Sequence, residues 1–223
     1  MRLSPVCVIG VLIAAPCLSA YGQNTESKDA RANEVKGMPP RATPGDYQAH
    51  AQAGAVTIAA EFMGHSVPKP EGPLSTEDYV VVETGFFGAP GSRIQLSTGD
   101  FSLKINGKKT PLPSQPSVLV TSSLKDPQWS PPEDAESKPK SKGGLSTGGQ
   151  SDSSSLPVVV HVPIELRHAM SQYVLRSSLP EGDRALPEAG LIFFQYRGRT
   201  KSIHSLELIY SGPAGKTTLA LQP

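Results

Sequence analysis

Apolar and polar residues alternate in short runs along most of this chain. Alternation with a period of two places the apolar side chains on one face of an extended strand. Three runs, 79–87, 158–162 and 191–196, are apolar at successive positions, as expected for strands that are buried on both faces. The pattern predicts about eight strands: 55–62, 79–87, 101–105, 108–112, 158–162, 191–196, 206–210 and 217–221.

Two local signals add a turn and a helix to these strands. Asn106 and Gly107 lie between two of the runs, and both residue types readily adopt the positive φ that a type I′ turn needs. A hairpin is therefore predicted between 101–105 and 108–112. A helix is predicted over 163–176, because a proline suits its first position and apolar residues follow at helical spacing.

The N-terminal residues have the features of a secretory signal. Arg2 precedes an apolar run over 6–18, which at about 13 residues is shorter than the roughly 20 that span a bilayer. Small residues stand just before Gln23, as they do at signal cleavage sites. We expect a cleaved signal peptide over 1–22 and export to the periplasm or the exterior. An uncleaved anchor is the alternative.

Two polar segments interrupt the predicted strands. Residues 23–45 carry mixed charges, and we expect a flexible tether there, with a short edge strand as the alternative. Residues 130–155 are rich in Ser, Gly, Pro and Lys, so they bury too little surface to offset the entropy of ordering. The strands on either side are too few to cover a sheet alone. We therefore expect one domain over 46–223 with 130–155 as a disordered inserted loop, rather than two domains.

Composition and strand spacing place the chain in the all-β class. We expect an immunoglobulin-like antiparallel β-sandwich of about eight strands with one short helix. The 21 Lys and Arg nearly balance the 20 Asp and Glu, which gives no reason to expect nucleic acid or an anionic membrane as the main partner. Both cysteines, Cys7 and Cys17, lie in the predicted signal, so the mature chain would have no disulfide. No membrane span is expected once the signal is removed.

One basic cluster is the candidate contact for an anion or a partner. Arg197, Arg199 and Lys201 lie close together between two predicted strands, and Lys216 follows after the next strand. Lysine and arginine on one surface attract anionic groups, although such charges are more often simply solvated.

A second constellation has the spacing of metal ligands. Glu165 and His168 would share a face of the predicted helix, and His161 precedes it. Exposed polar residues explain the same spacing, so no metal site is assigned. The sequence GLSTG at 144–148 has the G-x-S-x-G spacing, but it lies in the Ser- and Gly-rich segment 130–155, where nothing would hold a catalytic geometry, so we assign no catalytic residue and expect no cofactor.

Several segments resemble known exported proteins. Residues 100–107 (DFSLKING), 186–198 (LPEAGLIFFQYRG), 205–210 (SLELIY) and 212–216 (GPAGK) are similar to uncharacterised exported proteins of soil bacteria. The strand order resembles the immunoglobulin-like sandwich of the bacterial immunoprotective extracellular antigen type. The shared motifs are structural, so this resemblance implies a fold and no active residues.

These observations favour an exported, non-enzymatic binding or structural module. Its expected partner is an unidentified protein or component of the cell envelope. A carbohydrate-active or other hydrolytic module on the same scaffold is the alternative, because a fold does not determine a function. A concave pocket with convergent titratable groups would distinguish the two.

Overall fold

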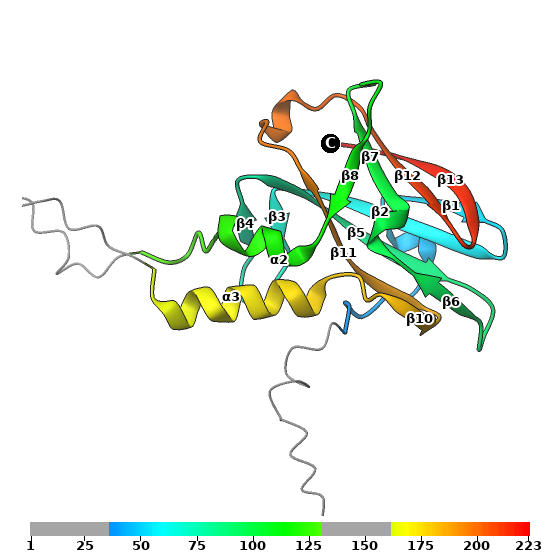
Figure 1. Cartoon of the computed structure of the whole chain (residues 1–223), viewed down its shortest axis with the longest axis horizontal. Coiled ribbons are helices and arrows are strands. Elements are labelled where there is room, and N and C mark those ends of the chain that lie inside the picture. Colours follow the sequence, from blue (N-terminus) through cyan, green and yellow to red (C-terminus); the bar gives the residue numbers. More distant parts are fainter. Residues whose placement is uncertain (1–35, 131–161) are drawn as a thin grey trace, which may run out of the picture. The chain divides into compact units, whose positions relative to one another are not determined.

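The computed structural model describes residues 36–130 and 162–223 of the chain (Figure 1). The predicted signal peptide 1–22 and most of the predicted tether lie outside the described residues. The same holds for nearly all of the inserted loop and, apart from Val162, for the predicted strand 158–162.

Strands make up most of the regular structure. They are β1 (Ala49–Ala53), β2 (Val56–Gly64), β3 (Ser66–Val67), β4 (Leu74–Thr76), β5 (Tyr79–Phe87), β6 (Arg93–Leu96), β7 (Phe101–Ile105), β8 (Leu112–Gln115), β9 (Leu124–Lys125), β10 (Gly182–Ala185), β11 (Glu188–Gln195), β12 (Leu206–Gly212) and β13 (Gly215–Leu221). The described α-helices are α2 (Ser117–Val120) and α3 (Ile164–Ser177), and short 3₁₀ turns are η1 (Pro44–Asp46), η2 (Thr98–Asp100), η3 (Thr121–Ser123) and η5 (Thr200–Ser202).

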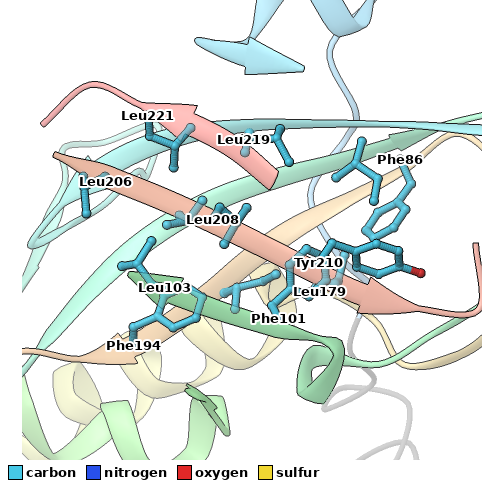
Figure 2. Packing of buried hydrophobic residues seen from close by; sticks show 14 of the residues in the cluster. Phe86, Phe101, Leu103, Leu179, Phe194, Leu206, Leu208, Tyr210, Leu219 and Leu221 are labelled. Carbon is cyan, nitrogen blue, oxygen red and sulfur yellow. The ribbon is translucent and has the colours of Figure 1, made fainter. Parts of the chain in front are cut away.

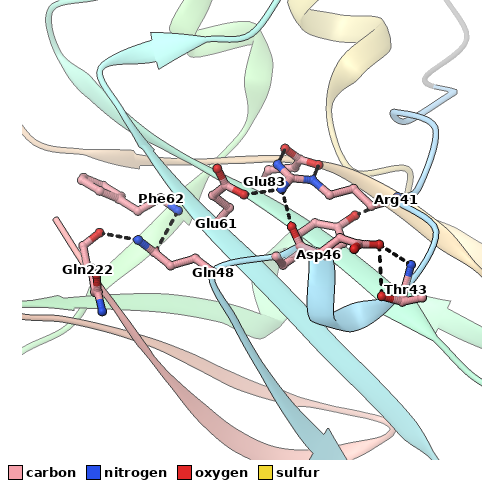
Figure 3. Close-up of polar contacts among 9 residues, drawn as sticks. Arg41, Thr43, Asp46, Gln48, Glu61, Phe62, Glu83 and Gln222 are labelled. Carbon is pink, nitrogen blue, oxygen red and sulfur yellow. Dashed lines mark hydrogen bonds and ion pairs between the residues drawn. The ribbon is translucent and has the colours of Figure 1, made fainter.

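The chain has an all-β, sandwich-like fold built on one large antiparallel sheet. Its eight strands follow the order β1-β2-β5-β11-β8-β7-β12-β13, while β6 pairs with β10 and β4 lies between β3 and β9. The sheet folds over so that β1 lies beside β13. At this junction Gln48 Nε2 donates to the backbone oxygen of Gln222 at 3.0 Å (Figure 3).

A hydrophobic core fills the space between the two halves of the folded sheet (Figure 2). Three aromatic rings lie together in it: the centroid of Phe86 is 5.9 Å from that of Phe101 and 5.9 Å from that of Tyr210. Leucines from β7, β12 and β13 extend the same core toward its other end. The alternating apolar positions predicted for these strands therefore face one another across the sandwich.

A second core covers the outer face of β5 and β11. Val81 of β5 and Phe193 of β11 are buried there against Met170 and Val174 of α3. Neighbouring positions of the same strands face the inner core, so both strands are buried on both sides. This confirms the prediction from their unbroken apolar runs, and α3 confirms the predicted helix.

The predicted hairpin forms, but its second strand begins later than expected. Asn106 and Gly107 have φ of 52° and 65°, as the turn requires. Pairing resumes with Leu103 opposite Leu112, so Lys108–Thr110 form an exposed loop and not the start of a strand. These residues have no apolar side chain to bury, and a proline follows them.

The end of the predicted tether is also part of the folded structure. The backbone nitrogen of Met38 donates to the oxygen of Ala189 at 2.8 Å, which adds a short bridge to the edge of β11. Tyr47 is buried, and its hydroxyl lies over Gly85 of β5, where a Cβ would come within 2.6 Å of it. Apolar side chains at these few positions dock a segment whose composition is otherwise polar. None of the helices over 36–130 and 162–223 is long and apolar enough to cross a membrane.

Candidate functional site

Two loops meet at one end of the sandwich, and we call them the paired loops: residues 106–110 between β7 and β8, and residues 196–205 between β11 and β12 (Figure 1, top). Asn106 joins them. Its side-chain nitrogen donates to the oxygen of Ser202 at 2.9 Å, and its side-chain oxygen accepts from the backbone nitrogen of His204 at 2.7 Å. One residue in a tight turn therefore fixes the position of both loops.

The paired loops carry a concentration of positive charge. Their exposed Lys and Arg side chains are Lys108, Lys109, Arg197, Arg199 and Lys201. Arg197 Nε pairs with Asp78 Oδ1 at 2.8 Å. Among the described residues, no carboxylate lies within ion-pair distance of the other four. The end of the sandwich thus presents several cations with no acidic partner within residues 36–130 and 162–223.

The structure keeps part of the predicted basic cluster together and separates the rest. Arg197, Arg199 and Lys201 share one loop, as their spacing implies. Lys216 pairs with Ser211 near the far end of β12, about 17 Å along the strand from the paired loops. Lys108 and Lys109 were not predicted to belong to this cluster. The predicted turn at Asn106 and Gly107 was the available signal, but nothing in the pattern placed that turn beside 196–205.

His65 contacts the loop 196–205, which is also held by Asn106. The ring nitrogens Nδ1 and Nε2 lie 2.8 Å from the backbone oxygens of Tyr79 and Gly198, respectively. The ring also stacks on Tyr196 at a centroid distance of 6.3 Å. A neutral imidazole donates to one of the two oxygens, and a doubly protonated ring donates to both. The doubly protonated ring therefore ties the loop to the start of β5 through both nitrogens, whereas the neutral ring makes only one of these two hydrogen bonds.

Acidic side chains gather at the opposite end of the same strands. Asp100 stands at the start of β7, and Glu188 is the first residue of β11. Burial raises the pKa of Asp100, and the negative charge of Glu181 adds to that rise. Burial also raises the pKa of Glu188, against the effect of Arg184. Since β7 leads from Asp100 to the paired loops, Asp100 and the cations of those loops lie at opposite ends of the sandwich, about 17 Å apart along the strand, while Lys216 lies at the same end as Asp100.

A cavity of about 470 Å³ lies at this acidic end. Leu179, Leu191 and Phe193 are among its apolar lining residues, with Thr98, Glu181 and Arg184 among the polar ones. Glu181 Oε1 accepts from the hydroxyl of Thr98 at 2.7 Å, and Arg184 Nε donates to the backbone oxygen of Glu181 at 3.0 Å. These polar groups therefore already hold η2 and β10 in position.

The most strongly paired charges fasten the N-terminal segment to the sheet (Figure 3). Arg41 Nε and Nη2 donate to the two carboxylate oxygens of Glu83 at 3.2 and 2.7 Å, and Nη1 meets both Glu61 and the backbone oxygen of Asp46. The Arg41 guanidinium also lies 4.6 Å from the ring centroid of Tyr47. The hydrogen bonds to Glu83 raise the pKa of Arg41, although burial opposes them. Because Glu61 and Glu83 stand opposite each other on β2 and β5, Arg41 neutralises a like-charge pair.

The predicted metal-ligand spacing does not form a cluster in the part of the chain that the structure describes. Glu165 and His168 are both exposed on α3, and Nε2 of His168 lies 3.4 Å from Nε2 of Gln172. His161 lies outside the described residues.

Comparison of the chain with protein-family models, with curated proteins and with solved structures finds no match. The resemblance to exported immunoglobulin-like proteins therefore stays a prediction.

Proposed function

We propose that this chain is an exported, non-enzymatic module that binds or spaces a component of the cell envelope or exterior through the paired loops. One observation carries the proposal: Asn106 brings unpaired cations from two separate loops onto one end of the sandwich. Loops that a rigid scaffold positions are the usual contact surfaces of β-sandwich proteins.

The anchoring of these loops supports a role in binding. Asn106 fixes one loop against the other, and His65 fixes 196–205 against β5. Loops that are already held in place lose less conformational entropy when a partner binds. Other polar contacts hold the fold together instead. They are the ion pair between Arg41 and Glu83 and the hydrogen bond from Thr98 to Glu181.

Photo-crosslinking in the native envelope tests the proposal. A crosslinking amino acid at exposed Thr110 in the paired loops should capture an envelope component, while the same group at exposed Thr218 on β13 should not. Reversing two charges with Lys108→Glu and Lys109→Glu should abolish the capture. Equal capture from both positions would contradict the proposal. So would capture that is unchanged by the Lys108→Glu and Lys109→Glu substitutions. Hydrolysis of an envelope polymer by the purified chain would favour the hydrolytic alternative.

A further inference from the structure

We propose that the partner of the paired loops is an acidic polysaccharide, a linear polymer that carries a carboxylate on its repeating sugar. This inference rests on the proposed function and identifies the class of partner. It follows from how the charges are displayed, from what surrounds them, and from the residue types of the loops.

The display of charge favours a polymer over a small anion. Lys108, Lys109, Arg199 and Lys201 are all exposed, and a single exposed ion pair contributes only about 0–1 kcal/mol. A chain with repeated charges can contact several of these cations at once and release several counterions, as other polyanions do when they bind. The affinity then comes from the number of contacts.

The location of the cavities points the same way. The cavity beside β10 and a second one of about 400 Å³ beside Tyr173 include no residue of the paired loops among their lining residues. The cations of the paired loops therefore lie away from these two cavities. An extended chain can lie across such a surface, whereas small ligands are usually enclosed.

The neighbouring side chains argue against a bilayer as the partner. Peripheral membrane proteins combine positive charge with apolar side chains that enter the lipid. The exposed large hydrophobic residues of the described chain are Val118, Leu119 and Ile164, on α2 and α3. None of them belongs to the paired loops.

The loops also lack the features that bind nucleic-acid bases. Single-stranded nucleic acids stack their bases on exposed aromatic rings. Tyr196 is the Tyr, Phe or Trp residue of these loops, but its ring stacks on His65 and its hydroxyl lies 3.1 Å from Oγ of Ser202. His204 is the one exposed imidazole of the loops, which is fewer rings than the successive stacking positions of a single-strand binder. The loops offer hydroxyl groups instead, at Thr110, Thr200 and Ser205, and hydroxyls are suitable hydrogen-bond partners for sugars.

Asn106 gives the inference a test that leaves every charge in place. Its side chain holds the lysines of one loop at a fixed position relative to the arginine and lysine of the other. Asn106→Gly permits the same positive φ, removes these side-chain hydrogen bonds, loosens the turn and changes no charge. A partner that contacts both loops at once should bind this variant more weakly.

The experiment measures binding of the full chain to immobilised polygalacturonate, with neutral dextran, oligothymidylate and phosphatidylglycerol vesicles as the other probes. We expect binding to polygalacturonate that weakens as salt rises, and none to dextran. Lys108→Glu with Lys109→Glu should weaken it about tenfold or more, and Asn106→Gly about threefold or more. Lys216→Glu, an exposed lysine on β13, is the matched control and should leave it within about twofold.

Three results would overturn the inference. The first is equal weakening by the Lys216 variant, which would mean attraction without a defined site. The second is equal or tighter binding to oligothymidylate or to the vesicles with the same dependence on the loop variants. The third is no binding to polygalacturonate while Thr110 still captures an envelope component in a charge-dependent way. In that last case the proposed function would stand and the polysaccharide would not be its partner.

Discussion

At the residue scale, Arg41 is the side chain whose loss should affect folding most among the charged groups. Its carboxylate partner Glu83 is only 6% exposed, so Arg41→Ala leaves a buried charge without a counterion. Breaking a fully buried pair costs about 3–5 kcal/mol, and we expect about 2–3 kcal/mol here because Arg41 itself is 30% exposed. Urea denaturation at pH 7 measures the change.

Arg93→Ala provides the matched control for this prediction. Its ion pair with Asp183 is more than half exposed on both sides, so its removal should leave the unfolding midpoint nearly unchanged. If both variants unfold at the same midpoint, the Arg41 contacts do not stabilise the fold.

Asp100 should have the opposite effect at neutral pH. Its pKa is raised above 3.8, so the folded state favours the neutral acid and ionisation at pH 7 costs stability. Asp100→Asn should therefore stabilise the chain at pH 7 by about 0.5 kcal/mol, a value kept small because the group is partly solvated. The gain should shrink as the pH falls through the raised pKa and vanish below about 3.8, where the carboxyl group is protonated in both states.

Urea midpoints at pH 7 and at acid pH test this sign. Part of the effect comes from Glu181, so the gain should be smaller in a Glu181→Gln background. A lower midpoint for Asp100→Asn at pH 7 would show that the ionised carboxylate stabilises the fold.

At the element scale, the chain after α3 passes close over β11. The backbone nitrogen of Leu179 donates to the oxygen of Leu191 at 3.0 Å, and a Cβ on Gly190 would lie 2.4 Å from the Cα of Leu179. Gly190→Ala should therefore push two backbones apart and cost about 3 kcal/mol. Thermal and urea unfolding measure the loss.

Gly99→Ala is the control, because a Cβ there meets Oγ of Ser97 at 3.4 Å and needs no positive φ. It should change stability by less than about 0.5 kcal/mol. Equal effects from the two variants would mean that the close passage over β11 imposes no steric limit.

The elements that could be predicted from sequence are those whose apolar pattern is strong. The runs at 79–87 and 217–221 have enough large apolar side chains to identify β5 and β13. β1 was missed because its apolar positions are alanines, β6 because its alternation covers only four residues, and β10 because it is short and has no large apolar side chain. The local sequence pattern is too short or too weak to identify these three strands. Each forms because longer strands and loops place it beside its pairing partner.

The candidate site was predictable only in part for the same reason. Arg197, Arg199 and Lys201 are close in sequence, so their proximity in space follows from spacing alone. Lys108 reaches the same end because β7 pairs with β12 and because Asn106 contacts residues almost a hundred positions later. Arg41 and Glu83 are likewise 42 residues apart, and neither one indicates its partner in the sequence.

At the scale of the whole molecule, β11 joins the part of the chain that precedes the predicted insert to the part that follows it. It pairs with β5 and β8, both of which precede 130–155 in the chain, while α3 and β11 follow it. Replacing 130–155 with a short Gly/Ser connection should therefore leave one unfolding transition at nearly the same midpoint, because changing the length of a flexible loop costs little, about 0.6 kcal/mol per doubling.

Limited proteolysis provides a second measurement of the same prediction. Cleavage is expected first at Lys138, Lys140 or Lys142, and the two fragments should remain associated on a sizing column. Fragments that separate and each stay folded would instead indicate two domains.

The exposed cations of the paired loops also make one end of the sandwich locally positive, although the formal net charge of the chain is only +1. Near a negatively charged wall, the field would exert a torque that turns the paired loops toward it before any contact forms. The Debye length is about 8 Å at physiological salt, so this rotation occurs only when the protein is within about that distance of the wall. Charge reversal at the loops should then lower the association rate constant for the wall more than it raises the dissociation rate constant. Added salt should bring the association rate constants of the reversed and unchanged chains together.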